Sequence, residues 1–280
     1  MLPDHDQLRS TLAAYITDSD SREAAAAAIA RMWQTATVDG AVLDLGRQAR
    51  CGFPEVIYGE GKSATLIIEI LKRQAAAGQA GFVTRVNPDV AAKIQAAFPD
   101  SRYNEIARTI RLSDSEQFAK SPAAASPPVV VITAGSTDLP VAEEAVETLR
   151  WMNVACELIQ DVGVAGPQRL LQQVDRLRDL AAVVVVAGME AALPSVVGGF
   201  VNCPVIGVPT SVGYGASLNG ITAMLSMLTC CASNVVTVNI DAGFRGGYVA
   251  GMIAKGQSTA TQVMGKANGF PRSAAASDTR

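Results

Sequence analysis

Apolar runs of strand length recur along the second half of the chain and alternate with stretches in which apolar residues have helical spacing. The runs are residues 129–133, 156–162, 183–187, 205–208 and 235–240, and the helical stretches are residues 141–153, 168–180, 194–201, 218–230 and 244–253. The runs are apolar throughout, as strands buried on both faces of a parallel sheet are. This alternation predicts a doubly wound α/β domain with helices on both faces of the sheet.

The first half of the chain predicts a smaller α/β domain. Its expected helices are residues 20–32, 62–77 and 90–98, and its expected strands are residues 38–45, 82–86 and 106–112. Residues 120–128 have the Pro, Ala and Ser content of a linker. We therefore expect an N-terminal domain over residues 1–119, a catalytic domain over residues 129–260, and a disordered tail over residues 261–280.

The composition narrows the classes of partner. A formal net charge of −3 predicts no nucleic-acid partner. No apolar run has membrane-spanning length, so no membrane partner is expected. The first thirty residues predict no signal or transit peptide, because they carry five carboxylates and lack a basic region followed by an apolar stretch: Asp4, Asp6, Asp18, Asp20 and Glu23.

The cysteine and histidine content limits the chemistry. Five cysteines without a C-x-x-C pair indicate neither a disulfide framework nor a structural zinc site, and they predict a cytoplasmic location. His5 is the only histidine and lies in an N-terminus that is expected to be frayed. A general acid or base must therefore be Glu, Asp, Lys, Cys or Tyr.

The turn after the first strand of the second half has the residues of a phosphate site. Gly135 allows a close approach of the backbone, and Ser136, Thr137 and the amides at the helix start can bind a phosphate. The alternative is an ordinary turn in which Asp138 caps the following helix. The turn taken alone favours neither interpretation.

Carboxylates follow two further strands at the edge where parallel sheets bind ligands. Gly188 and Met189, after the third strand, are expected to bind the substrate. Glu190, which follows them, is a candidate general acid or base, and the alternative is a carboxylate that stabilises the start of the next helix. Asp241 follows the fifth strand. It is a candidate for binding a ligand or for capping the next helix, and the sequence favours neither role.

Three cations lie close together in the N-terminal domain. Arg47, Arg50 and Lys62, near Glu55, suit an anionic substrate, because the arginine fork matches phosphate and carboxylate groups. The alternative is a solvated loop with surface ion pairs. The segment lacks the glycine spacing of a P-loop.

Two segments resemble the phosphoribosylaminoimidazole carboxylase/mutase family (PurE). GSTDLPVAEEA, residues 135–145, is similar to its phosphate-binding motif, and AGMEAALPSVVGGF, residues 187–200, is similar to its active-site segment. Two departures exclude the proton relay of that family. Ala192 stands where PurE has a histidine, and residues 161–166 replace its Ser-Ala-His-Arg.

The chain as a whole resembles the LarB family of nickel-pincer cofactor biosynthesis, over residues 38–252. The matching blocks are DLGRQARCGFPEVIYGEGK at 44–62, GMEAALP at 188–194, PTSVGYG at 209–215 and CASNVVTVNIDAGF at 231–244. This resemblance implies a PurE-like, flavodoxin-like three-layer sandwich. It also implies carboxylation of nicotinic acid adenine dinucleotide with hydrolysis of its phosphoanhydride, giving pyridinium-3,5-biscarboxylic acid mononucleotide and AMP.

The same resemblance assigns roles and partners. It implies that Cys231 is the nucleophile that forms a cysteinyl-pyridine intermediate and that Glu190 is the general acid or base. The thiols of Cys156, Cys203 and Cys230 are expected in the core. Carbon dioxide or bicarbonate is the implied co-substrate, Mg²⁺ the expected cation with unknown ligands, and a homo-octamer the implied assembly. The alternatives are a PurE-type carboxylase and a non-catalytic nucleotide-binding regulator.

Overall fold

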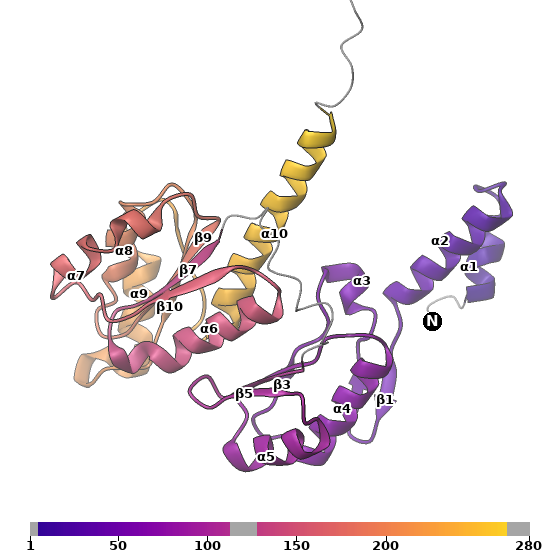
Figure 1. The fold of residues 1–280 in the computed structure, drawn as a ribbon, viewed down its shortest axis with the longest axis horizontal. Coiled ribbons are helices and arrows are strands. Elements are labelled where there is room, and N and C mark those ends of the chain that lie inside the picture. Colours follow the sequence, from indigo (N-terminus) through magenta and orange to yellow (C-terminus); the bar gives the residue numbers. More distant parts are fainter. Residues whose placement is uncertain (1–4, 113–127, 268–280) are drawn as a thin grey trace, which may run out of the picture. The chain divides into compact units, whose positions relative to one another are not determined.

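The computed structural model describes residues 5–112 and 128–267, with the side chains of residues 258–267 excepted. The chain divides into two compact units, residues 1–120 and residues 121–280, here called the first and second unit (Figure 1). The expected linker over residues 120–128 lies outside the described residues except for Pro128. No helix in the described ranges has both the length and the apolar character needed to cross a bilayer.

The second unit contains a five-stranded parallel sheet, which confirms the predicted fold class. Its strands are β7 (Val129–Thr133), β8 (Cys156–Ile159), β9 (Ala182–Ala187), β10 (Val205–Pro209) and β11 (Val235–Thr237), in the order β11-β10-β9-β7-β8. Every residue of the central strands β7 and β9 is buried. The strand order reverses direction between β7 and β9, and such a switch point is where doubly wound sheets bind ligands.

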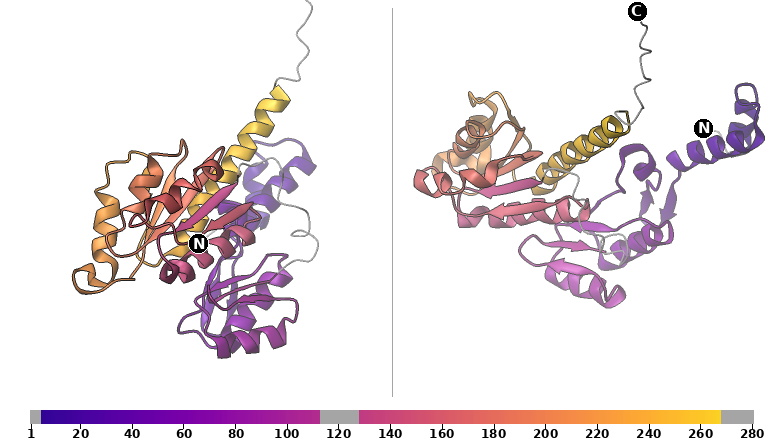
Figure 2. Two further views of the ribbon diagram at one scale, coloured as in Figure 1. Left: turned by 60° about the vertical axis from the view of Figure 1, so that its left-hand side comes forward. Right: turned by 45° about the horizontal axis from the view of Figure 1, so that its top comes forward.

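Helices cover both faces of this sheet (Figure 2). One layer consists of α6 (Leu139–Trp151) and α10 (Gly243–Ala267), which pack against each other and against the strands. The other layer contains α7 (Pro167–Leu171), the short 3-10 helix η2 (Val174–Leu177), α8 (Leu193–Gly198) and α9 (Ile221–Leu228), whose buried side chains share one core cluster with the strands. The three layers are those of a flavodoxin-like sandwich.

Several predicted boundaries in this unit differ from the structure, and two of these differences change the helices. Residues 168–180 form α7 and η2 rather than one helix, and Leu171 is 57% exposed, so the apolar residues of this stretch do not share one buried face. The predicted disordered tail begins inside α10, which continues to Ala267. The remainder of that tail, residues 268–280, lies outside the described residues.

Helices α6 and α10 pack backbone against backbone. A Cβ atom on Gly243 would lie 2.1 Å from the carbonyl oxygen of Val141, and one on Gly247 would lie 2.5 Å from the carbonyl oxygen of Ala145. The buried carboxylate of Glu144 accepts a hydrogen bond from the N–H of Phe244 at 3.0 Å, so α6 also satisfies a donor at the start of α10.

Replacing Gly247 by alanine is therefore expected to force the two helices apart. We expect the free energy of unfolding to fall by about 1–3 kcal/mol, as overpacked cores generally show. Chemical denaturation followed by circular dichroism measures this change. Gly256→Ala is the matched control on the same helix, because nothing lies within 4 Å of its Cβ position. Equal destabilisation by both variants would contradict close packing as the cause.

The first unit is a smaller α/β unit, as predicted. A mixed sheet has the order β3-β4-β6-β5, with β3 (Ile57–Tyr58) parallel to β4 (Phe82–Thr84), and with β5 (Arg102–Asn104) and β6 (Thr109–Arg111) antiparallel to their neighbours. Helices α4 (Ala64–Ala76) and α5 (Pro88–Ala97) contribute buried apolar residues to its core. The helices α1 (His5–Leu12) and α2 (Ser19–Met32) pack against each other.

The structure corrects several expectations here. The strand expected at residues 38–45 is a hairpin of β1 (Ala36–Val38) and β2 (Ala41–Leu43), whose Asp39-Gly40 turn places Gly40 at φ 85°. The polar run over residues 44–60 contains the short helix α3 (Arg47–Cys51) as well as β3. His5, expected in a frayed segment, begins α1, and its Nε2 atom lies 3.4 Å from a carboxylate oxygen of Glu23.

Candidate active site

A cavity of about 310 Å³ opens at the edge of the second unit where β7, β8 and β9 end, here called the carboxyl edge. It lies at the switch point of the sheet. Six of the residues proposed from the sequence line it: Gly135, Thr137, Asp138, Gly188, Met189 and Glu190. The parallel sheet therefore brings the phosphate-type turn and the candidate acid or base to one site.

Asp138 organises the turn after β7. Its carboxylate accepts the N–H of Gly135 at 2.9 Å and the hydroxyl of Thr210 at 2.7 Å, so it ties this turn to the end of β10. Asp138 is the N-cap residue of α6 and makes no side-chain bond into that helix. Its bond to Gly135 closes a capping box at the start of the turn, so the capping alternative is observed in part, and ligand binding by Asp138 stays a prediction. Burial raises the pKa of the Asp138 carboxyl, while these hydrogen bonds act in the opposite direction.

The neighbouring hydroxyls remain accessible to a ligand. Ser136 and Thr137 belong to the short 3-10 helix η1 (Ser136–Asp138), and both are exposed. The carboxylate of Asp138 binds the N–H of Gly135 and the hydroxyl of Thr210, so these bonds do not involve the hydroxyls of Ser136 and Thr137. The arrangement is compatible with the phosphate interpretation of the turn.

Glu190 stands on a strained turn after β9. Met189 and Ala191, on either side of it, adopt left-handed backbone conformations at φ 52° and φ 50°. Gly188 is required before them, because a Cβ there would lie 2.5 Å from the carbonyl oxygen of Val212. Such strain is found at functional sites. The side chain of Glu190 is exposed to the cavity, and the N-cap of α8 is Ala192 without a side-chain bond, so Glu190 does not cap that helix.

Two lining residues were not identified from the sequence. Asp161 follows β8, and its carboxylate lies 2.8 Å from the guanidinium of Arg169 on α7. The available signal was the pair Gly163 and Gly166 in the segment that departs from PurE, because glycines that close together indicate a loop in contact with another group.

Asp241 lies at the same edge, between β11 and α10. Its Oδ1 atom accepts the N–H of Ser211 at 2.8 Å, so it joins the loop after β11 to the loop after β10. Its charge contributes to the raised pKa of Asp138. A structural contact is therefore observed for Asp241, and ligand binding by it stays a prediction.

Cys231 does not lie at this cavity. Helix α9 runs back from the end of β10 and stops at Leu228, not at Cys230 as predicted, and Cys231 follows in a bend before β11. In that bend, the carbonyl oxygen of Asn234 accepts the N–H of Val205, the first residue of β10. Cys231 is therefore at the opposite edge of the sheet, roughly 15 Å from the cavity at 3.3 Å per strand residue. Its side chain is exposed.

The other cysteines are only partly where the sequence placed them. Cys203 is buried, as predicted, and burial raises the pKa of its thiol. Cys156, on the edge strand β8, and Cys230, after the end of α9, are half-buried rather than in the core. Cys51 is exposed at the end of α3.

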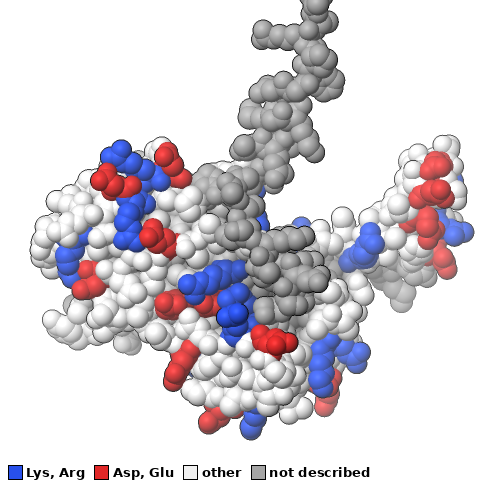
Figure 3. Space-filling model, in the orientation of Figure 1, with Lys and Arg blue, Asp and Glu red and all other residues white. Residues whose placement is uncertain are grey.

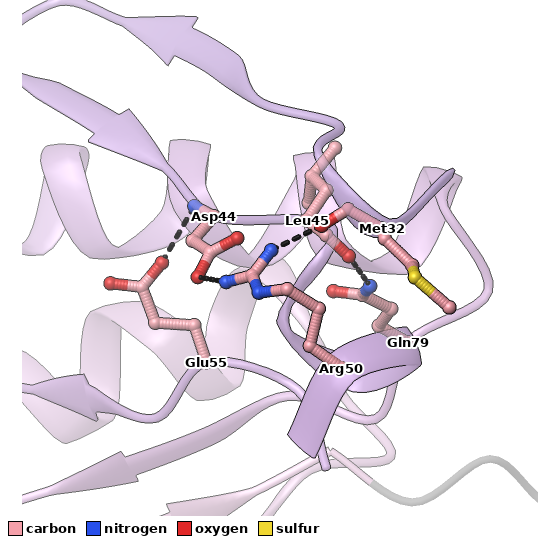
Figure 4. A network of polar contacts seen from close by, with 6 residues as sticks. All are labelled: Met32, Asp44, Leu45, Arg50, Glu55 and Gln79. Atoms are coloured by element: carbon pink, nitrogen blue, oxygen red, sulfur yellow. Dashed lines mark hydrogen bonds and ion pairs between the residues drawn. The ribbon is translucent and has the colours of Figure 1, made fainter. Parts of the chain in front are cut away.

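Two of the charged residues proposed in the first unit, Arg50 and Glu55, belong to one polar network (Figure 4). Arg50 donates to the carboxylate of Asp44 and to the carbonyl oxygen of Met32. The carboxylate of Glu55 accepts the N–H of Asp44 at 2.8 Å. These contacts are of the kind expected if the segment is a loop with surface ion pairs, and substrate binding by Arg50 and Glu55 stays a prediction.

The other two cations of that segment differ from each other. Lys62 donates to the carbonyl oxygen of Tyr58 at 2.8 Å, within the same loop. Arg47 is exposed at the start of α3. Substrate binding by these residues stays a prediction.

The donor set does not fit a protein-held metal ion. Within residues 5–112 and 128–257, no group of three or more His, Cys, Asp or Glu side chains is arranged to hold one. At the cavity, Asp138 and Asp161 already have partners in Thr210 and Arg169. Mg²⁺ as the expected cation, with unknown ligands, therefore stays a prediction.

Comparison with protein families gives two adjoining matches. Residues 35–114 match the family described as LarB/PurE-like N-terminal domain, and residues 128–268 match the family described as AIR carboxylase. The two matched regions fall in the first and second unit, respectively.

Individual proteins are similar over different lengths. An uncharacterized protein of Methanocaldococcus jannaschii, MJ0165, is 40% identical over 220 residues, which are 76% of this chain and 83% of that protein. The N5-carboxyaminoimidazole ribonucleotide mutase of Thermotoga maritima is 28% identical over 130 residues, 45% of this chain and 74% of that protein. A solved structure of a Treponema denticola PurE2 variant covers 52% of this chain and 99% of its own, with 16% identity and a TM-score of 0.36.

Proposed function

This chain belongs to the LarB family, with a PurE-like C-terminal domain, and from that premise we propose that it carboxylates the pyridinium ring of nicotinic acid adenine dinucleotide. Carbon dioxide or bicarbonate is the co-substrate. Hydrolysis of the phosphoanhydride then gives pyridinium-3,5-biscarboxylic acid mononucleotide and AMP. The enzyme class, a PurE-fold carboxylase, follows from the family; the substrate and products are the proposal.

One observation carries the proposal. Glu190 faces a cavity at the switch point of the sheet, beside a phosphate-type turn, in a site where Ala192 replaces the histidine of PurE. A carboxylate at this position can take a proton from a ring carbon, and the described part of the site contains no imidazole that could do so. This donor set suits a reaction other than that of PurE.

The chemistry requires a nucleophile, because an electron-poor pyridinium ring does not attack carbon dioxide. Addition of the Cys231 thiolate ortho or para to the ring nitrogen forms a C–S bond and moves an electron pair onto that nitrogen. The resulting enamine carbon forms a bond to carbon dioxide. Glu190 then accepts the proton of that carbon, and the C–S bond breaks, which returns the electron pair to sulfur and restores the aromatic ring.

This role requires the thiol of one copy of the chain to reach the cavity of another, because Cys231 is at the opposite edge of its own sheet. The surface beside it suits self-association. Residues 191–240 contain no Asp, Glu, Lys or Arg. Exposed apolar side chains follow one another on α9, which leads to the thiol, and Leu218 adds a further one just before the helix: Ile221, Leu225 and Leu228 are the three on α9. The corner of the second unit that holds α9 is largely uncharged in Figure 3.

Such a continuous apolar surface marks a protein contact rather than a solvated face. A homo-oligomer in which α9 packs against a second copy would bury it and carry Cys231 across the contact. The homo-octamer of the PurE type is one assembly of this kind.

The proposed function is tested directly by its products. We expect the full-length chain, incubated with nicotinic acid adenine dinucleotide, bicarbonate and magnesium, to release AMP and a doubly carboxylated pyridinium mononucleotide, both identified by mass spectrometry. With ¹³C-bicarbonate the mononucleotide should gain one mass unit. Turnover of aminoimidazole ribonucleotide instead, or no product from either compound, would refute the proposal.

A further inference from the structure

The first unit has a cavity of its own, of about 240 Å³, where α4 and α5 end. Its described lining side chains are apolar apart from those of Gln79, Asp100 and Ser101. None of the residues with a role in the proposed reaction lines it, so a ligand bound there would be distinct from the substrate of that reaction.

Gln79 leaves a hydrogen-bond acceptor without a partner in the wall of this cavity. The residue is only 8% exposed, and its Nε2 atom donates to the carbonyl oxygen of Leu45 at 2.6 Å (Figure 4). Because that bond holds the amide nitrogen, the remaining polar atom is Oε1, which is buried and has no hydrogen-bond partner among the described residues. Native proteins usually satisfy such an atom, since leaving it unpaired is costly. A ligand with an N–H donor would satisfy it.

The surroundings of this acceptor favour a positively charged donor. Within the described lining, Asp100 is the one charged residue, and it is exposed. The lining also includes Ala75 and Ala97, in the last turns of α4 and α5, so two helix C-termini with partial negative charge meet at the cavity. Arg73, in the last turn of α4, is exposed and lies outside the lining.

The apolar walls suit a short alkyl chain. Phe98, the C-cap residue of α5, contributes an aromatic ring, and alkylammonium groups bind favourably against aromatic faces. Leu112 forms another part of the wall, and its N–H donates to the carbonyl oxygen of Gly81 at 3.0 Å. A Cβ atom on Gly81 would lie 2.6 Å from the side chain of Leu112, so close packing fixes this wall.

We propose that this cavity binds a small primary alkylammonium ion. The ammonium group donates a hydrogen bond to Oε1 of Gln79 and is attracted by the carboxylate of Asp100. The alkyl chain lies against Phe98 and Leu112. The reaction proposed for the second unit neither uses nor forms an amine of this kind, so the cavity is a binding site separate from catalysis.

Saturation-transfer NMR on the full-length protein with n-butylammonium chloride tests this proposal. We expect a millimolar Kd, the range of affinities that so small a ligand allows. Neutral n-butanol has the same alkyl chain. It should bind at least about tenfold more weakly, because it lacks the charge that Asp100 and the helix ends attract.

Two exposed alanines of α5 provide a matched pair of variants. Ala97→Lys places a competing ammonium group in the wall of the cavity and should raise the Kd of n-butylammonium at least about tenfold. Ala96→Lys adds the same charge to the adjacent residue, outside the described lining, and should change the Kd less than about twofold. Asp100→Asn should raise the Kd about twofold to fivefold, as the loss of an exposed charge does. Gln79 is kept intact, because its amide nitrogen also holds Leu45.

Several results would overturn the proposal. They are no saturation transfer from the wild-type protein to n-butylammonium, equal affinities for n-butylammonium and n-butanol, equal Kd values for the Ala97→Lys and Ala96→Lys variants, and wild-type affinity in Asp100→Asn. A failure of carboxylation would leave all these measurements unaffected, since the two cavities share no described lining residue.

Discussion

Cys231→Ala is expected to lower the rate of carboxylation on the order of 10³-fold or more, because without the sulfur the ring carbon never becomes nucleophilic. The thermal unfolding midpoint should stay close to that of the wild type, because the side chain is exposed and contributes little packing. Product formation under single-turnover conditions measures the first quantity, and differential scanning calorimetry measures the second.

Cys230→Ala is the matched control for this prediction. Cys230 is the adjacent residue and also a thiol, but it is half-buried, and its sulfur lies 3.8 Å from the carbonyl oxygen of Ala232. We expect this variant to retain carboxylation. If Cys231→Ala turned over at the wild-type rate, the thiol would have no part in the mechanism, and a nucleotide-binding role without covalent chemistry would become the better interpretation.

Glu190→Gln is expected to lower carboxylation about 10²- to 10⁴-fold, the usual contribution of a positioned acid or base. Glutamine keeps the size and the exposed position of the side chain but cannot accept the proton. AMP binding should be unchanged, since the charge of Glu190 is not needed to hold a phosphate. Glu157→Gln, on β8 and outside the cavity, is the control that should retain activity.

The Cys231→Ala and Glu190→Gln variants together test whether one active site takes residues from two copies of the chain. Cys231→Ala and Glu190→Gln chains, co-expressed so that they assemble together, should recover about a quarter of the wild-type activity, because random pairing gives that fraction of sites both intact residues. Each variant assembled alone should stay inactive. No recovery in verified mixed oligomers would refute a shared site. The thiol and the carboxylate would then have to act within one chain, although they lie at opposite edges of its sheet in this structure.

The layered fold was predictable because its signal is local. Residues 129–133 are strand β7 to the residue, since an uninterrupted apolar run of that length between turn residues favours a buried parallel strand. Short elements were harder to predict in both units. The turn Asp39-Gly40 divides one expected strand into a hairpin, and the expected helix at 168–180 is two short segments, because burial of each face depends on distant partners.

The sequence alone was sufficient to bring Ser136, Gly188 and Glu190 to one edge of a sheet, because in a parallel sheet every turn that follows a strand lies on the same side. It was also sufficient to show that the chain has a single histidine, His5, outside the segments of the second unit that form the cavity. Only the folded chain revealed the pairing of Asp161 with Arg169, the network that occupies Arg50 and Glu55, and the far-edge position of Cys231. These features depend on which segments meet across the fold and on the direction in which a helix returns, and neither is encoded in the residues around any one position.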